Sequence, residues 1–177
     1  QHKAIGVDAK ANAIKFEVND DVKADVLNVL PPMRAGTIAQ QTGLANINAR
    51  WCDVNYMTYE SKVHAGIHVI GDSIQLAPLM PKSGHMANQQ GKVAAAAIIE
   101  LLAGRAPHTQ PVVMNTCYSF VDAKSAIHVA SIHQYSAEQK TMLTVPGSGG
   151  VSGGGATELE GTYAMAWAQN IWADMLA

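Results

Sequence analysis

The chain has 177 residues, of which 48% are apolar and 15% charged, and its formal net charge is −2. This length and composition are typical of a folded protein with a sizeable core and exclude a disordered chain. The Lys and Arg residues are dispersed, and the longest apolar run, 93–99, is far shorter than the roughly 20 residues of a membrane helix, so we expect neither nucleic acid nor a membrane span.

Short strands and one short helix are predicted for the first sixty residues. Apolar runs separated by turn-forming residues indicate three strands, over 3–8, 13–18 and 24–30. A helix is predicted over 33–42, since Gly43 is a typical C-terminal stop. Residues 46–61 are predicted to form a loop with short extended pieces.

Residues 66–104 carry the pattern that says most about function. A short apolar strand over 67–70 leads to Gly71-Asp72, and a Pro-containing loop connects these residues to a helix predicted over 85–103. A carboxylate after a buried strand accepts hydrogen bonds from sugar-like hydroxyls in flavin and nicotinamide sites. The pattern predicts the returning half of a flavin site, whose Gly-x-Gly-x-x-Gly first half is absent from these residues. Alternatively, Asp72 only caps the following turn.

The residues before this helix, Pro81-Lys82-Ser83-Gly84, offer a second binding feature. A helix N-terminus has unpaired N–H groups and partial positive charge, which suits the negative end of a reduced flavin. The alternative is that Lys82 is a solvated surface residue and Ser83 a plain N-cap. Within the helix, apolar residues at intervals of four form two adjacent rows, which predict a broad buried face. One row is Val93, Ala97 and Leu101, and the other is Ala94, Ile98 and Leu102.

The C-terminal part changes character. Antiparallel strands are predicted over 112–120 and 126–134, with a third over 141–145, and the Gly-rich segment 146–155 is predicted to be a flexible turn. Thr157 and Glu160 have the spacing of a capping box before the last helix. That helix repeats apolar residues at intervals of four, which predicts a docking face: Leu159, Tyr163, Trp167, Ile171 and Met175.

The two cysteines, Cys52 and Cys117, lack the C-x-x-C spacing of zinc and thioredoxin-type sites. They could pair with each other, pair with cysteines outside this chain, or stay reduced. Cys117, in Asn115-Thr116-Cys117-Tyr118-Ser119, is either a redox group or a packed core residue. The histidines are scattered without a third ligand nearby, so no metal site is predicted.

Several segments resemble the flavoprotein subunit of flavocytochrome c sulfide dehydrogenase, in the same order and at similar spacing. They are VLNVLPPMRAG, WCDVNYMTYESKVHAGIHVIGD, MPKSGHMANQQGKVAAAAI, NTCYS, and the stretch from PGSGG to AMAWAQNIWADM. MPKSG and NTCYS are specific to this family, whereas Gly-Asp and the Ala-rich helix occur throughout the flavoproteins related to pyridine-nucleotide-disulfide reductases. The resemblance covers about residues 24–177.

The resemblance implies an α/β (α+β) fold: the C-terminal part of a flavoprotein with two dinucleotide-binding domains, followed by a small α+β domain. Residues 1–45 would be the tail of the nicotinamide-type domain and 46–105 the returning half of the FAD domain. Residues 106–177 would face the flavin and a cytochrome. The implied FAD contacts are Gly71, Asp72, Pro81, Lys82, Ser83 and Ala87, and the residue implied to be catalytic is Cys117.

The resemblance also implies a reaction and its partners. Sulfide attacks a disulfide that includes Cys117, and the electrons pass through FAD to a c-type haem in the periplasm. The partner cysteine and the covalent flavin attachment site would lie in the N-terminal half of the flavoprotein, which these residues do not include. The alternatives are a sulfide:quinone oxidoreductase-like flavoprotein and a non-catalytic nucleotide-binding module.

Overall fold

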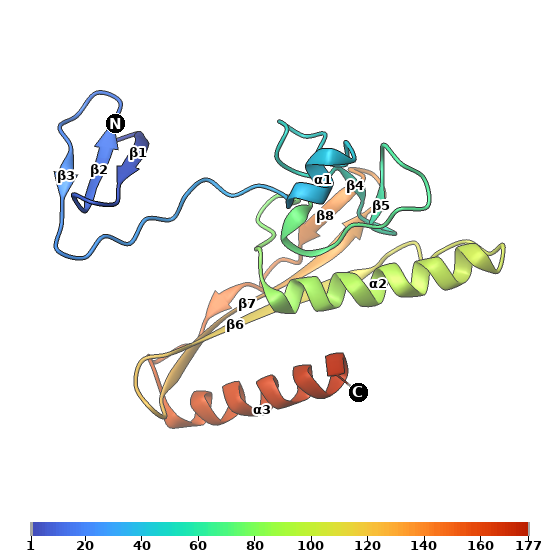
Figure 1. Ribbon diagram of the computed structural model, residues 1–177. Helices are drawn as coiled ribbons and strands as arrows, with labels where there is room; N and C mark the ends of the chain where they lie inside the picture. Colours follow the sequence, from blue (N-terminus) through green and yellow to red (C-terminus); the bar gives the residue numbers. More distant parts are fainter. Residues whose placement is uncertain (1, 177) are drawn as a thin grey trace. The chain divides into compact units, whose positions relative to one another are not determined.

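The computed structural model describes residues 2–176. It divides into two compact units, Gln1–Met33 and Arg34–Ala177. Figure 1 shows the elements of both units coloured along the sequence. The architecture is mixed α+β, with three helices and small antiparallel sheets among the described residues. This confirms the expected mixture of helices and strands, although no extended parallel sheet is formed within this part of the chain.

The first unit is a three-stranded antiparallel sheet in the order β1-β2-β3. Its strands are β1 Ala4–Asp8, β2 Ala13–Phe16 and β3 Val22–Lys23. The strand predicted over 24–30 is wrong, because the side chains of Val26 and Leu30 are 87% and 90% exposed and this stretch is not in a strand. A strand needs a neighbour for its backbone N–H and C=O groups, and the sheet already ends in the two-residue β3.

The second unit begins with a short helix and several loops. It contains α1 Thr37–Gln41, the strand pair β4 Val54–Asn55 and β5 Glu60–Ser61, and the 3₁₀ turn η1 Gly71–Ser73. The strand predicted over 67–70 is wrong. The backbone there bonds to the loop beside it, with Ser61 N–H donating to Ile67 O at 2.7 Å and Val69 N–H to Tyr59 O at 2.9 Å. A buried parallel strand requires strands at its sides, and this segment forms one isolated bridge, His68 with Glu60.

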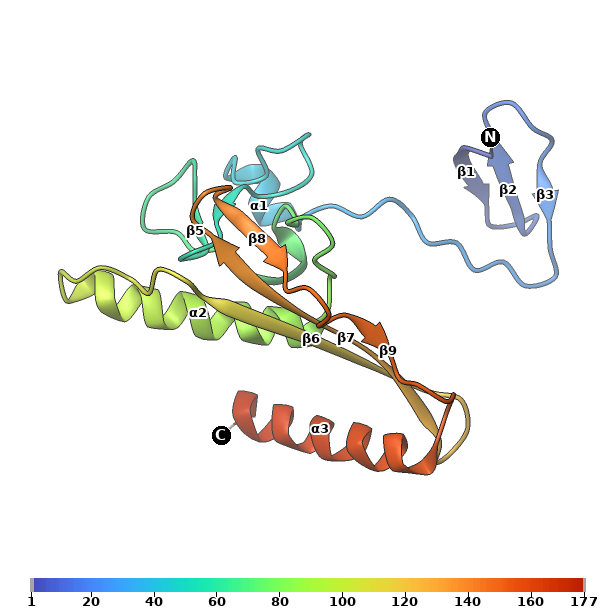
Figure 2. The ribbon, with the colours of Figure 1, turned by 180° about the vertical axis from the view of Figure 1, so that it is seen from behind.

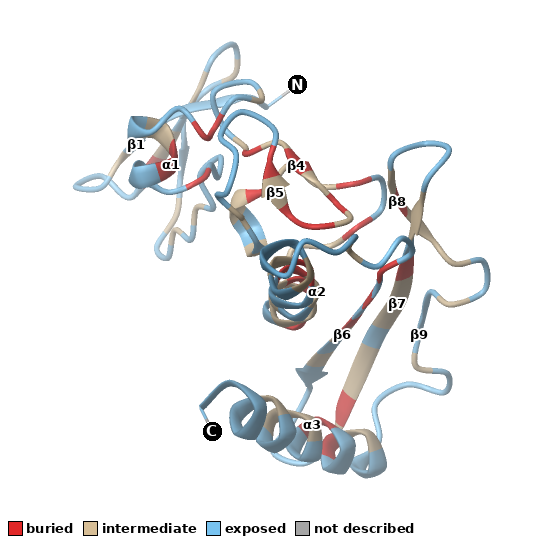
Figure 3. Ribbon diagram, turned by 90° about the vertical axis from the view of Figure 1, so that its right-hand side faces the viewer, coloured by how far each residue is buried: buried red, intermediate tan, exposed pale blue. Residues whose placement is uncertain are grey.

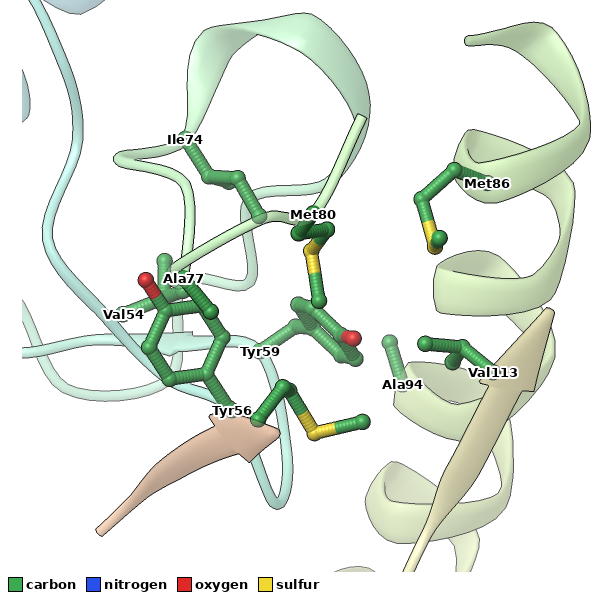
Figure 4. Close-up of a cluster of buried hydrophobic side chains, with 10 residues drawn as sticks. Val54, Tyr56, Tyr59, Ile74, Ala77, Met80, Met86, Ala94 and Val113 are labelled. Carbon is green, nitrogen blue, oxygen red and sulfur yellow. The ribbon is translucent and has the colours of Figure 1, made fainter. Parts of the chain in front are cut away.

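Helix α2, Gly84–Leu102, supplies one wall of the main core. Ala94 and Ala97 are buried, but Leu101 and Leu102 are 44% and 84% exposed, so the predicted buried face stops one turn early. Most of the side chains packed in this core come from residues 54–80, in β4 and the loops that follow it. Figure 4 shows the side chains that converge between those loops, α2 and β6: Val54, Tyr56, Tyr59, Ile74, Ala77, Met80, Met86, Ala94 and Val113.

A long antiparallel ribbon follows, and its first three strands confirm the strands predicted for this part of the chain. The strands are β6 Val112–Phe120, β7 Ala126–Ser136, β8 Thr141–Thr144 and β9 Gly150–Val151. Cys117 in β6 lies opposite Val129 in β7. The Gly-rich segment is more ordered than predicted, because Val151 in β9 also pairs with Val129. Figure 2 shows β9 running beside β7 on this ribbon.

Helix α3, Glu158–Leu176, packs on β7 through its small residues. Gly161 and Ala164 are buried, and Figure 3 shows that most of the rest of α3 is exposed. The predicted docking row is only partly buried: Trp167 and Ile171 are half-buried, whereas Leu159, Tyr163 and Met175 are more than half exposed. Positions four apart advance by about 40° around a helix, so this row turns away from the sheet at both ends.

The N-terminus of α3 has half of the predicted capping box. Glu160 N–H donates to Thr157 Oγ1 at 3.1 Å, as expected. The Glu160 carboxylate does not return to the cap, because its Oε2 lies 2.6 Å from Nδ1 of His128 in β7. Near the other end of α3, Asp174 accepts hydrogen bonds from Asn88 at 2.7 Å and Lys92 at 2.9 Å, which ties α3 to α2. None of the helices in residues 2–176 combines the length and apolar character needed to cross a bilayer.

Candidate functional site

The candidate site lies where the first turn of α2 meets strand β6 and helix α3. A cavity of about 310 Å³ opens there. Its wall includes Ser83 and His85 from α2, Cys117 and Tyr118 from β6, and Trp167 from α3. Three elements far apart in the sequence therefore build one cavity around the thiol of Cys117.

Gly71 forms a tight turn against α2. Its φ of +70° is favourable for glycine, and its N–H donates to Oε1 of the buried Gln90 at 2.7 Å. A Cβ at Gly71 would lie 3.3 Å from the Cβ of Ala87. The predicted cofactor residues Gly71 and Ala87 thus face each other, and their small size allows the turn to approach the helix. Asp72, the next residue, is exposed at the first turn of η1.

Lys82 is used structurally, so its interpretation as a solvated surface residue is wrong. Its Nζ donates to the backbone oxygen of Asp72 at 2.5 Å and of Ile74 at 3.1 Å. The same ammonium lies 4.0 Å from the ring centroid of Trp51, within the range of a cation–π contact. Burial lowers the pKa of Lys82, and the nearby charge of Asp72 opposes that effect. Lys82 therefore holds the Asp72 turn beside the start of α2, following Pro81.

Ser83 caps α2 and also contacts β6. Its Oγ accepts a hydrogen bond from Met86 N–H at 3.0 Å and donates to Oδ1 of Asn115. The Asn115 side chain is 3% exposed, and its Nδ2 lies 3.4 Å from Sγ of Cys117, which is exposed. The structure thus places the predicted residues Ser83 and Cys117 on either side of one buried amide.

His85 and Trp167 also line the cavity. The backbone N–H of Thr116 donates to His85 Nδ1 at 3.0 Å, and the rings of His85 and Trp167 meet edge to face at 5.4 Å. Burial lowers the pKa of His85, and the charge of Lys92 adds to the effect. Trp167 Nε1 is buried and has no hydrogen-bond partner within residues 2–176.

Cys52 is separate from this site. It is fully buried in a second core cluster with Ala35, Ala39 and Leu44, and burial raises the pKa of its thiol. Both cysteines are free, so the alternative of a Cys52–Cys117 pair is wrong for this structure. Among residues 2–176, no three His, Cys, Asp or Glu side chains lie close enough together to hold a metal ion.

Sequence reasoning missed Asn115, His85, Gln90 and Trp167 as members of the site. The period of two in β6 could have found Asn115, because Val113, Asn115 and Cys117 share one face of the strand. The other three carry no such signal, since their partners are contributed by segments distant in the sequence.

One comparison with known proteins bears on the β6 and α3 residues of this cavity. A family model described as "Flavocytochrome c sulphide dehydrogenase, flavin-binding" matches residues 109–176. This segment is similar to the flavin-binding domain of flavocytochrome c sulfide dehydrogenase. It covers β6 to α3 and therefore includes Cys117 and Trp167, which confirms the resemblance for this part of the chain. The cavity residues at the start of α2, Ser83 to His85, lie before the matched segment in the sequence.

The residues around the cavity fit a flavin. Trp167 Nε1 is a buried donor without a partner among the described residues. Gly84 leaves open space at the start of α2, since a Cβ there would meet no atom within 4 Å. The first N–H groups of a helix have no partner within the helix, so they suit the electron-rich edge of a flavin ring. The cavity thus combines the start of α2 and Trp167 with the thiol of Cys117.

Proposed function

We propose that this chain is the C-terminal part of an FAD-dependent sulfide dehydrogenase flavoprotein, in which Cys117 is the reactive cysteine. The observation that carries the proposal is the position of Cys117: an exposed thiol in the wall of the cavity, inside a flavin-binding domain of this enzyme class. A thiol in the hydrophobic core could not meet a dissolved substrate, as the fully buried Cys52 illustrates.

The proposed reaction starts from a disulfide between Cys117 and a cysteine of the N-terminal half. Hydrosulfide attacks one sulfur, the S–S bond breaks, and one cysteine becomes a persulfide while the other leaves as a thiolate. FAD, when held at this site, would supply a two-electron acceptor for that thiolate and a route to a c-type haem. The role of this chain is to hold Cys117 beside the start of α2 and to keep bulk water from its buried side through Asn115 and Trp167.

The remaining site residues have positioning and binding roles in this proposal. Asp72 offers an exposed carboxylate to the hydroxyls of the ribityl chain. The small residues Gly71 and Ala87 allow the turn that contains Asp72 to approach α2, and Lys82 holds this turn in place. Pro81 and Ser83 set the start of α2 near the isoalloxazine.

We also propose a division of the chain into three parts. Residues 1–45 are the tail of the nicotinamide-type domain, residues 46–105 are the returning half of the FAD domain, and residues 106–177 are the flavin-facing domain.

The partners are proposed from the same family relationship. They are the N-terminal half of the flavoprotein, a c-type cytochrome subunit and sulfide, and the proposed location is the periplasm. The exposed apolar side chains of α3, including Leu159, Tyr163 and Met175, support the docking of further protein on that helix.

The test uses the complete flavoprotein assembled with its cytochrome. Cys117→Ser should abolish sulfide-dependent cytochrome reduction while the flavin stays bound, whereas Cys52→Ala should retain turnover. Sulfide oxidation by Cys117→Ser at the wild-type rate would overturn the proposal. Transfer of electrons to a quinone and not to the cytochrome would instead favour the quinone-reducing alternative, and a protein that binds no flavin would favour the non-catalytic module.

A further inference from the structure

A row of hydrogen bonds connects the N-terminus of α2 to the sulfur of Cys117 through the buried side chain of Asn115. Met86 N–H donates to Ser83 Oγ at 3.0 Å, so the hydroxyl proton of Ser83 is available to Asn115 Oδ1. Asn115 Nδ2 then lies 3.4 Å from Cys117 Sγ. In these three hydrogen bonds each donor lies on the side away from the sulfur and each acceptor on the side toward it. Hydrogen bonds aligned in this way strengthen one another.

We infer that Asn115 is a positioning residue that stabilises Cys117 as a thiolate and orients its sulfur. The inference rests on the proposed function and deepens it, since the thiolate is the group that leaves when sulfide opens the disulfide. Asn115 is fixed from two sides, because Ser83 holds its Oδ1 and β6 holds its backbone opposite Ser131 of β7.

The amide of Asn115 can serve both forms of the cysteine. Cys117 Sγ also lies 3.5 Å from Asn115 Oδ1. As a thiol, the sulfur donates its proton to Oδ1, whereas as a thiolate it accepts from Nδ2. Nδ2 carries partial positive charge from the amide and from the α2 N-terminus behind Ser83, so the amide favours the charged form. Cys52, by contrast, lies among apolar side chains.

The first experiment measures the rate at which iodoacetamide alkylates Cys117 in the folded, reduced chain, by peptide mass spectrometry at near-neutral pH. Asn115→Leu removes both amide atoms, and Asn115→Asp places a carboxylate beside the sulfur. Each should slow the alkylation of Cys117 about five- to tenfold. Ser83→Ala should slow the alkylation about two- to threefold, because it removes a hydrogen bond that is one step further from the sulfur.

Thr157→Ala is the matched control, because it removes the same type of cap from α3 without touching Cys117. Its Cys117 should react at the wild-type rate, and Cys52 serves as the internal standard for unfolding. Wild-type rates in both Asn115 variants would overturn the inference. Equal slowing in Thr157→Ala and Ser83→Ala would also overturn it, since a general loosening would then explain the effect.

A second measurement avoids any risk that Asn115 variants fail to fold. In the wild-type chain, the NMR signals of the Asn115 side-chain amide should shift as the pH is raised and Cys117 ionises, and this shift should be absent in Cys117→Ser. The inference would be overturned if the Asn115 amide signals showed the same pH dependence in the wild-type chain and in Cys117→Ser. Neither experiment requires flavin, haem or sulfide, so failure of the proposed function and failure of this inference are distinguishable.

Discussion

The imidazole Nδ1 of His85 accepts a hydrogen bond from the backbone N–H of Thr116 at 3.0 Å. This contact fastens the first turn of α2 to strand β6, one residue before Cys117. It requires a ring nitrogen without a proton, so it exists only while Nδ1 is an acceptor. Two elements that are 31 residues apart in the sequence are thereby held at the spacing that forms the cavity.

The stability of this unit should therefore depend on pH. Burial lowers the pKa of His85 and of His133 below the ordinary value of 6.5. A lowered histidine pKa means that the unfolded chain binds more protons, so the stabilisation is present above about pH 6.5 and is lost as the pH falls below it. We expect the free energy of unfolding, measured with urea, to decrease from neutral pH toward mildly acidic pH.

His85→Asn tests the source of this dependence. Asn offers an oxygen that can accept from Thr116 N–H but does not titrate in this range, so the slope of stability against pH should become shallower. The slope that remains should come from His133, which is fully buried. An unchanged slope in the variant would assign the whole effect to other groups.

A glycine in α3 should not tolerate a side chain. A Cβ at Gly161 would lie 1.7 Å from the backbone oxygen of Lys124, so Gly161→Ala should push α3 from the loop before β7 and destabilise the unit by about 1–3 kcal/mol. The matched control is Gly91→Ala in α2, where the Cβ would meet only Ile70 Cδ1 at 3.4 Å. The control should be neutral or stabilising, because alanine favours a helix. Thermal unfolding of both variants provides the comparison, and equal effects would contradict the close packing of α3.

The indole N–H of Trp167 should reveal whether the cavity holds the flavin. Trp167→Phe removes an unpartnered buried donor together with some packing, so these effects should largely offset and stability should change by less than about 1 kcal/mol. If the donor reaches the flavin, the flavin absorption maximum of the assembled flavoprotein should shift. Trp172→Phe, at a residue that is 58% exposed, is the control. Unshifted flavin spectra in both variants would place the flavin elsewhere.

Gln90 should be essential for the turn that contains Asp72. Gln90→Leu leaves the N–H of Gly71 without its acceptor, which should cost about 1–3 kcal/mol and accelerate hydrogen exchange at the Gly71 amide. Gln89→Leu changes the neighbouring, half-buried glutamine, whose Nε2 donates to Asn88 Oδ1 at 3.3 Å. Stability of the control should change by less than about 0.5 kcal/mol. Similar exchange rates in the two variants would show that another group holds the turn.

The sequence predicted helix caps and strand bounds correctly where they depend on residues close together in the chain. Ser83 caps α2, the strand 112–120 has the predicted bounds, and Thr157 caps α3, because helix caps and strand periodicity act over a few residues. The same reading was wrong for residues 24–30 and 67–70, whose apolar composition indicated strands. A strand depends on a neighbour that local composition does not describe.

The sequence by itself determined the elements of the site: a glycine turn, a capped helix and a cysteine in a strand. The tertiary structure decided how they meet. Only folding brings Ser83 to Asn115, turns Lys82 onto the backbone of residues 72–74, and places Trp167 in the wall of the cavity that contains Cys117. The physical reason is that these contacts join segments about 10 to 80 residues apart, and hydrogen-bond partners at such separations are fixed by packing, not by local sequence.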